Sequence, residues 1–184
     1  PEWDPRYVHR EPAALRDLHA LATTQISYIK IIQFLFHRQW QQLKDYALER
    51  GVLLFGDMPI YIALDSSDAW ASPELLCLNG DGRPGYVAGV PPDYFSEDGQ
   101  LWGNPLYDWD RHSAHGYRWW IERLRQSASL ADIVRIDHFR GFAGYYEIPA
   151  SSPDATQGRW VSAPGKALFA AIERALGKLP IVAE

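Results

Sequence analysis

IVRID, at residues 133–137, is the stretch that decides the fold of this 184-residue chain. It is short and largely apolar, and the residues before it repeat with the period of a helix. The positions that share the apolar face of that helix are Tyr117, Trp120, Ile121 and Leu124. A helix followed directly by a short apolar strand is the unit from which parallel α/β proteins are built. We therefore predict one such unit here.

A second helix–strand unit precedes it. Residues 25–50 predict a long amphipathic helix that ends before Gly51, and its apolar positions are Ile26, Ile29, Ile32, Phe36, Trp40, Leu43 and Ala47. The next run, residues 52–57, is apolar up to its final acid. This composition predicts a strand that is buried on both faces, as in a parallel sheet.

A third unit ends the sequence. Ser162, placed before Pro164, predicts the start of a helix, Gly177 predicts its end, and residues 179–184 predict the strand. The apolar stripe of this helix is Leu168, Ile172 and Leu176. Three consecutive units indicate a parallel α/β architecture, either a closed barrel or an open doubly wound sheet. No glycine-rich phosphate loop follows a strand, which argues against a dinucleotide-binding sheet.

Residues 56–110 differ from these units, and we predict a loop-rich active-site insertion within one catalytic domain that covers residues 1–184. Seven glycines and six prolines lie between positions 56 and 105, a density that by itself indicates disorder. Aromatic residues at positions 61, 70, 86, 94, 95 and 102 need a surface to pack against. We therefore expect an ordered excursion at the barrel face where catalytic residues gather.

Composition narrows the classes of partner. The net charge of −5 provides no basic footprint for nucleic acid, and no apolar run is long enough to span a membrane. The single cysteine, Cys77, permits no intrachain disulfide, and no Cys/His spacing resembles a zinc site. We expect a cytoplasmic protein that binds neither nucleic acid nor membranes and needs no metal.

Each predicted strand ends in an acid: Asp57, Asp137 and Glu184. The carboxyl ends of parallel strands meet at one mouth of a barrel, so we expect these side chains to share a pocket. Two carboxyl groups beside the anomeric carbon of a sugar are what glycosidic cleavage requires. For one acid alone, capping a helix or closing a turn is the commoner role.

The neighbours of two of these acids favour chemistry. Arg135 lies two residues before Asp137, so both side chains point to one face of the strand. The cation there favours the ionised form that a nucleophile needs, although a purely structural salt bridge would use the same residues. Three apolar residues precede Glu184, and an apolar setting raises the pKa of a carboxyl group toward that of a proton donor.

Residues 135–142 (RIDHFRGF), 87–96 (VAGVPPDYFS) and 99–107 (GQLWGNPLY) carry a resemblance to a known family. They resemble the nucleophile strand, the flexible active-site loop and the donor-site segment of 4-α-glucanotransferases, also called amylomaltases or disproportionating enzymes. These enzymes belong to the α-amylase clan of (β/α)-barrel proteins. Residues 55–61 (FGDMPIY) and 181–184 (IVAE) are similar to the family's third strand and its acid/base strand, and all segments occur in the family's order.

This resemblance implies a partial (β/α)8 TIM barrel, about strands 3 to 5, and retaining transfer of part of a 1,4-α-glucan to the 4-hydroxyl of an acceptor. It implies Asp137 as the nucleophile that forms a glucosyl ester, Glu184 as the general acid/base, and Arg135 as the residue that keeps Asp137 charged. The maltooligosaccharide would be bound by Asp57, Asp93, Tyr94, Phe95, Gln100, Trp102 and His138. Among these, Trp102 would stack on a sugar, and residues 93–95 would form a lid. No cofactor is implied.

Two alternatives stay open. An amylase-like hydrolase would pass through the same intermediate and release the glucan to water, and a non-catalytic carbohydrate-binding fragment would keep only the aromatic side chains. The sequence shows neither the phosphate loop nor the metal-binding acids of a nucleotide-sugar transferase. The family also has a third catalytic carboxylate on a later strand. We therefore expect a piece of a longer protein, with little activity on its own.

Overall fold

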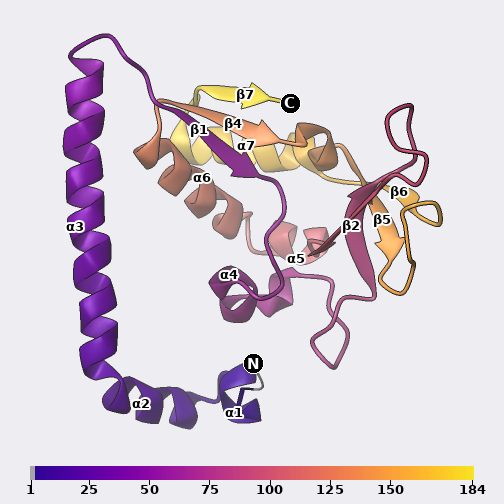
Figure 1. Ribbon diagram of the computed structural model, residues 1–184, viewed down its shortest axis with the longest axis horizontal. Coiled ribbons are helices and arrows are strands. Elements are labelled where there is room, and N and C mark those ends of the chain that lie inside the picture. Colours follow the sequence, from indigo (N-terminus) through magenta and orange to yellow (C-terminus); the bar gives the residue numbers. More distant parts are fainter. Residues whose placement is uncertain (1–2) are drawn as a thin grey trace. The chain divides into compact units, whose positions relative to one another are not determined.

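The computed structural model describes residues 3–184 and divides into two compact units, one that reaches Val52 and one over Leu53–Glu184. The first unit consists of helices α1 (Pro5–Val8), α2 (Pro12–Leu21) and α3 (Thr23–Leu48) (Figure 1). Helix α1 begins after Asp4, whose carboxylate accepts a hydrogen bond from the backbone N–H of Arg6 at 2.9 Å. Such a cap satisfies one of the free N–H groups of the first turn.

Helix α3 forms where the sequence predicts it, but none of its side chains is buried. The predicted apolar positions Ile29, Ile32 and Phe36 are exposed. The reason is that α2 is the element of this unit that packs against α3, and it covers little of it. An apolar period favours a helix, whereas burial also needs a partner surface.

The second unit contains the predicted parallel sheet. Strands β1 (Phe55–Pro59), β4 (Ile133–Asp137) and β7 (Ile181–Ala183) pair in parallel in the order β1-β4-β7. Helices α6 (Arg118–Leu130) and α7 (Gly165–Leu176) follow the predicted helix–strand alternation, although Ser162 lies in a strand and does not cap α7. The architecture is therefore α/β. The three strands leave two open edges and do not close into a barrel.

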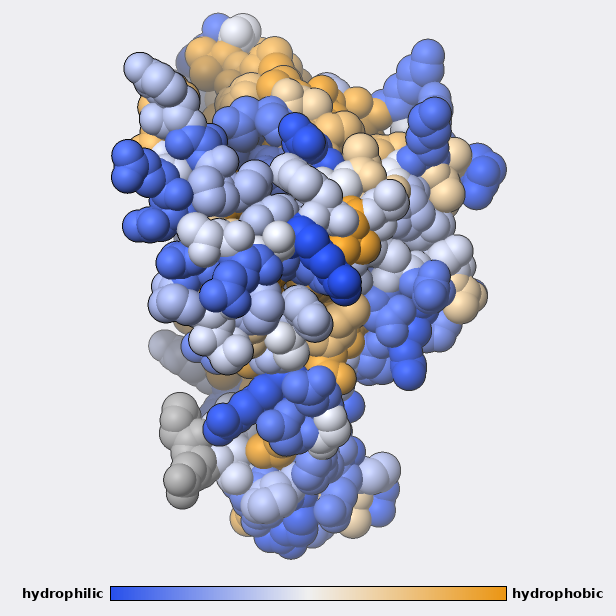
Figure 2. All heavy atoms as spheres, turned by 90° about the vertical axis from the view of Figure 1, so that its right-hand side faces the viewer, coloured by the Kyte–Doolittle hydropathy of each residue, from blue (hydrophilic) through white to orange (hydrophobic). Residues whose placement is uncertain are grey.

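Burial in this sheet is one-sided. Val134 and Ile136 of β4 are buried against Trp120 and Leu124 of α6 and Leu168 of α7, all in the main hydrophobic core. The prediction that the first strand is buried on both faces is wrong, because the side chains of Leu53 and Phe55 are exposed at the edge. Hydrophobic side chains reach the surface over part of the face shown in Figure 2, and Phe55 of β1 and Val182 of β7 are among the exposed apolar residues.

A second, antiparallel sheet accounts for much of the predicted insertion. Its strands are β2 (Tyr86–Val90), β3 (Gln100–Pro105), β5 (Gly144–Pro149) and β6 (Arg159–Ser162), in the order β3-β2-β5-β6. Of the aromatic side chains of the insertion, Tyr61 is buried, whereas Tyr94 and Phe95 are exposed. Strands β5 and β6 lie outside residues 56–110 and were not predicted.

Short helical segments connect the two sheets. They are α4 (Ser67–Ala71), η1 (Pro73–Leu75), α5 (Trp109–Ala114) and η2 (Phe139–Phe142). Ser66 caps α4 through a hydrogen bond from the Ala69 N–H, and Asp108 caps α5 through one from the Arg111 N–H. The segment η2 begins after His138, whose backbone is left-handed with a φ of 54°. This turn redirects the chain at the end of β4.

Candidate active site

The strand register places the three predicted acids on one open side of the parallel sheet. In the register of the sheet, Asp57 of β1 is opposite Arg135 of β4, and Arg135 is opposite Val182 of β7. These three side chains therefore lie level across the sheet. Asp137 and Glu184 come two residues further along β4 and β7, and therefore on the same face. The opposite face of β4 is packed on helices, so only this face is free to bind a ligand.

The guanidinium of Arg135 joins all three acids. Its Nη1 donates to Asp57 Oδ1 at 2.7 Å, and its Nη2 donates to Asp137 Oδ1 at 2.9 Å. The same Nη2 lies 3.0 Å from Glu184 Oε2. Each of the three carboxylate side chains keeps roughly half or more of its surface exposed. We call these four residues the carboxylate cluster.

The geometry bounds the separation of the two proposed catalytic carboxylates. Because Asp137 and Glu184 share Arg135 Nη2, their contacting oxygens lie no further apart than the sum of the two distances. That sum is about 6 Å, so the two carboxylates lie close together on this face of the sheet. The cluster therefore suits attack by one carboxylate and proton transfer by the other.

The environment of Glu184 differs from the prediction. Hydrogen bonding with Asp137 and with the backbone N–H of His138, together with the charge of Arg135, lowers the pKa of Glu184. The expectation of a raised pKa is wrong for this state, because the apolar residues before Glu184 do not surround its carboxyl group. Polar groups from β4 surround it instead, and they favour the ionised form.

His138 connects the cluster to the antiparallel sheet. Its backbone N–H lies 3.5 Å from Glu184 Oε2, and its ring meets the ring of Trp102 edge-on at a centroid distance of 5.0 Å. Burial lowers the pKa of His138, which favours the neutral imidazole. Its Nε2 is buried without a hydrogen-bond partner among residues 3–184. Because this nitrogen is buried, a sugar hydroxyl could pair with it only after neighbouring side chains move.

Gln100 holds Trp102 in place. The indole Nε1 donates to Gln100 Oε1 at 2.9 Å, and both residues belong to β3. Trp102 is also near Tyr61, with ring centroids 6.2 Å apart. The structure thus brings seven of the ten sequence-predicted site residues together. Asp57, Arg135, Asp137, His138 and Glu184 lie at the end of the parallel sheet. Trp102 contacts His138 through its ring, and Gln100 is hydrogen-bonded to Trp102.

The predicted lid residues lie elsewhere. Asp93 Oδ1 accepts hydrogen bonds from the N–H groups of Phe95 and Ser96, both at 2.8 Å, so this acid shapes its own loop. The side chains of Tyr94 and Phe95 are 97% and 94% exposed and contact each other edge-on. Among the residues that the structure describes, no hydrogen bond or ring contact joins this loop to the carboxylate cluster.

One part of the site was not predicted from the sequence. Arg123 of α6 donates to the carbonyl oxygens of Pro59 at 2.6 Å and Ile60 at 3.0 Å, and the Tyr107 hydroxyl donates to the latter at 2.7 Å. Asn104 of β3 donates to the carbonyl oxygen of Ile62 at 2.9 Å. These contacts fix the backbone that leaves β1 just after Asp57. An arginine on a helix gives no local signal that it binds a distant carbonyl.

No metal-binding arrangement was found in the described chain: within residues 3–184, no three His, Cys, Asp or Glu side chains are grouped as ligands of an ion. The positive charge in the carboxylate cluster is that of Arg135. In the same described part of the chain, no helix is both long enough and apolar enough to cross a membrane.

Comparison with known proteins identifies the family. The family described as 4-alpha-glucanotransferase matches residues 1–184, the whole chain. The chain belongs to the 4-alpha-glucanotransferase family. It is 50% identical over 185 residues to a 4-alpha-glucanotransferase of Synechocystis, with all of this chain and 37% of the relative covered. It is 51% identical over 175 residues to one of Thermus thermophilus, with 95% and 35% covered.

Solved structures of the family agree with the fold. Amylomaltase from Streptococcus agalactiae, in complex with acarbose, superimposes with a TM-score of 0.93 at 46% identity, over 100% of this chain and 37% of that one. Amylomaltase from Corynebacterium glutamicum, at 21% identity, matches 82% of this chain and 24% of its own with a TM-score of 0.69, which supports the fold alone. The chain spans little more than a third of the curated 4-alpha-glucanotransferases that it matches.

Proposed function

We propose that the protein containing this chain is a retaining 4-α-glucanotransferase in which the parallel sheet is a segment of a (β/α)8 barrel, about strands 3 to 5. The observation that carries the proposal is the pair of carboxylates held by one nitrogen of Arg135. The substrates would be maltooligosaccharides and other α-1,4-glucans. The single cysteine favours a cytoplasmic setting, and the net charge of −5 disfavours nucleic acid as a partner.

The proposed first step is attack by Asp137. One carboxylate oxygen of Asp137 forms a bond to the anomeric carbon, and the bond from that carbon to the leaving glucan oxygen breaks. The proton of the Glu184 carboxyl group moves to that oxygen, so the leaving glucan departs with a free 4-hydroxyl. The product is a glucosyl ester on Asp137.

The second step returns Asp137 and Glu184 to their starting states. The 4-hydroxyl oxygen of an acceptor bonds to the anomeric carbon as its bond to Asp137 breaks, and the hydroxyl proton moves to Glu184. Because Glu184 has a lowered pKa in the unliganded structure, substrate binding must weaken its polar contacts before it can donate a proton. A sugar that excludes water and displaces the Arg135 contact supplies such a change.

The remaining site residues would position the glucan. Trp102 offers a ring face for stacking, and His138 and Asp57 offer polar atoms for sugar hydroxyls. Asp93, Tyr94 and Phe95 would close over the acceptor side. Their loop would have to move for this, since Tyr94 and Phe95 point into solvent here.

The exposure of Tyr94 and Phe95 also favours a second candidate, an α-glucan hydrolase. Without a closed lid, water can reach the half-exposed Asp137 and take the glucan in place of an acceptor. Incubating the full-length protein with maltotriose separates the two. Longer oligomers together with glucose support transfer, and shortened products alone would establish hydrolysis.

Substitution of the nucleophile tests the mechanism. Asp137→Asn in the full-length protein should abolish covalent labelling by a fluorinated glucosyl donor, because an amide cannot form the ester. Asp65→Asn is the matched control, since Asp65 is exposed and lies outside the carboxylate cluster. Undiminished labelling of Asp137→Asn would contradict the assignment and leave a carbohydrate-binding role.

A further inference from the structure

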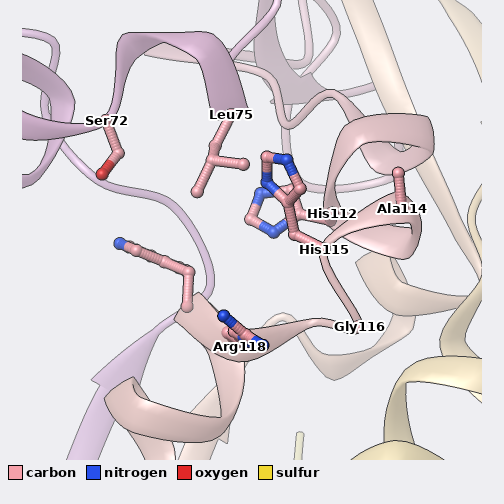
Figure 3. Close-up of a pocket in the computed structure, with 8 residues that line it drawn as sticks. Ser72, Leu75, His112, Ala114, His115, Gly116 and Arg118 are labelled. Carbon is pink, nitrogen blue, oxygen red and sulfur yellow. The ribbon is translucent and has the colours of Figure 1, made fainter.

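A cavity of about 640 Å³ lies apart from the carboxylate cluster and shares none of its residues. It is bounded by η1, α5 and the start of α6, all within the second unit. Figure 3 shows Ser72, Leu75, the two imidazoles of His112 and His115, and Arg118 around this space. The volume falls within the roughly 300–1,000 Å³ that small-molecule sites occupy.

His112 is the unusual member of this lining. Its side chain is 1% exposed, yet neither ring nitrogen has a hydrogen-bond partner among residues 3–184. The Leu75 carbonyl oxygen, which accepts the Asp108 N–H at 2.9 Å, lies near the ring, but neither ring nitrogen meets it with hydrogen-bond geometry. A buried polar atom without a partner costs free energy, so a group that pairs with it inside the cavity is favoured.

The imidazole of His112 is held in a fixed orientation. Its ring lies 5.4 Å from the ring of Tyr107, 5.5 Å from that of Trp109 and 5.8 Å from that of Trp119, measured between centroids. Burial lowers the pKa of His112 to about 4, so the ring is neutral at pH 7. A neutral imidazole presents one donor and one acceptor that point in different directions, and either of them can pair with a hydroxyl group.

The other lining groups fit a neutral polyol as well. Trp119 contributes an aromatic surface, and the Arg123 guanidinium stacks on its ring at 5.2 Å. Ser72 adds a hydroxyl that can donate and accept, and Arg118 adds planar donors at the exposed side. An anion is less well matched at the inner end, because His112 is uncharged and the carboxylate of Asp108 lies nearby.

We propose that the cavity lined by Ser72, His112, Arg118 and Trp119 is a second carbohydrate site that holds a glucose unit of an α-1,4-glucan. The choice of a glucan among neutral polyols rests on the proposed function. Such a site anchors a long glucan away from the reacting bond, which raises the local concentration of chain ends at the carboxylate cluster.

The test uses the full-length protein with Asp137→Asn, so that no substrate is consumed, and with isotopically labelled histidine. The His112 signal is identified by its loss in His112→Leu, and maltose is then titrated. We expect the signals of His112 and His115 to shift, and the affinity measured at these signals to fall by roughly tenfold in Ser72→Ala. His37→Leu, on α3, serves as the control substitution.

The signal of His138 in the same titration reports on the carboxylate cluster. If His138 shifts while His112 does not, the second site is refuted and the proposed function stands. If His112 shifts alone, the second site stands and the cluster is not the glucan site. Inorganic phosphate is the contrasting probe: a response of His112 to phosphate and not to maltose overturns the assignment of a neutral sugar.

Discussion

At the scale of single residues, Arg135 organises the site. One guanidinium contacts three carboxylates, and the hydrogen bond to Asp57 together with the charges of all three raises the pKa of Arg135. A guanidinium can do this because its nitrogens lie in a rigid planar fork, whereas an ammonium is a single point charge. The role of this residue therefore depends on shape as well as charge.

Arg135→Lys tests this distinction. We expect kcat/KM for maltotriose disproportionation to fall by about 100-fold, because lysine cannot hold Asp57 and the catalytic pair together. The measurement is steady-state kinetics on the full-length protein. Arg125→Lys, an exposed α6 position paired with Glu122, is the control. Activity of Arg135→Lys within twofold of the unmodified protein would show that charge alone suffices.

The burial of His112 leads us to predict that the stability of the fold depends on pH. Its pKa is lowered from 6.5 to about 4 by burial, so the unfolded chain takes up a proton before the folded chain does. The unfolding free energy is therefore unaffected by protonation of His112 above pH 6.5. As the pH falls from 6.5 toward 4, protonation of His112 in the unfolded chain lowers the unfolding free energy by at most roughly 3 kcal/mol. Thermal unfolding measured across this range should show a flatter pH profile for His112→Leu than for His37→Leu. Parallel profiles would mean that His112 titrates normally.

At the scale of elements, β2 and β3 depend on a glycine. A Cβ on Gly89 would lie 2.2 Å from the Gln100 carbonyl oxygen and 2.4 Å from Ile148 Cδ1, so any side chain there separates the strands. Because Gln100 holds Trp102, such a separation would also disturb the site. The sequence shows a glycine at this position, and only the pairing of strands shows why.

Gly89→Ala should lower the unfolding free energy by roughly 1–3 kcal/mol and weaken maltooligosaccharide binding. Gly80→Ala is the matched control, since a Cβ there meets nothing within 4 Å. Thermal unfolding and ligand titration of the two variants give the comparison. If both behave alike, the close approach at Gly89 is not maintained in solution.

The helix–strand units were predictable because their signals are local. Residues 133–137 form β4 as predicted, and Trp120 and Leu124 of α6 are buried as their spacing indicates. The antiparallel sheet was not predicted, since β5 pairs with β2 across more than fifty residues of sequence. The first strand also extends past Asp57 to Pro59, because its end is set by pairing with β4.

At the scale of the whole molecule, many large apolar side chains are exposed. Helix α3 exposes Ile29, Ile31, Ile32 and Phe34 among other apolar side chains, and Phe55 and Val182 are exposed on β1 and β7. The two outer strands of the parallel sheet also carry unpaired backbone groups. Surfaces of this kind associate with other chains when nothing covers them.

We therefore expect the isolated 184 residues to form oligomers or aggregates and to show little turnover of maltooligosaccharides. Size-exclusion chromatography coupled to light scattering gives the mass, and product analysis gives the activity. The full-length protein, measured in parallel, is the control. A stable monomer of 21.0 kDa with robust transfer activity would contradict this expectation.

The sequence by itself determined the alternation of helices and strands and the face of β4 that carries Arg135 and Asp137, because periodicity is set by neighbouring residues. Only the tertiary structure decided the pKa of Glu184 and the unpartnered burial of His112. It also decided which predicted apolar faces are covered. These properties depend on groups that are distant in sequence and become neighbours only through packing, so no local pattern encodes them.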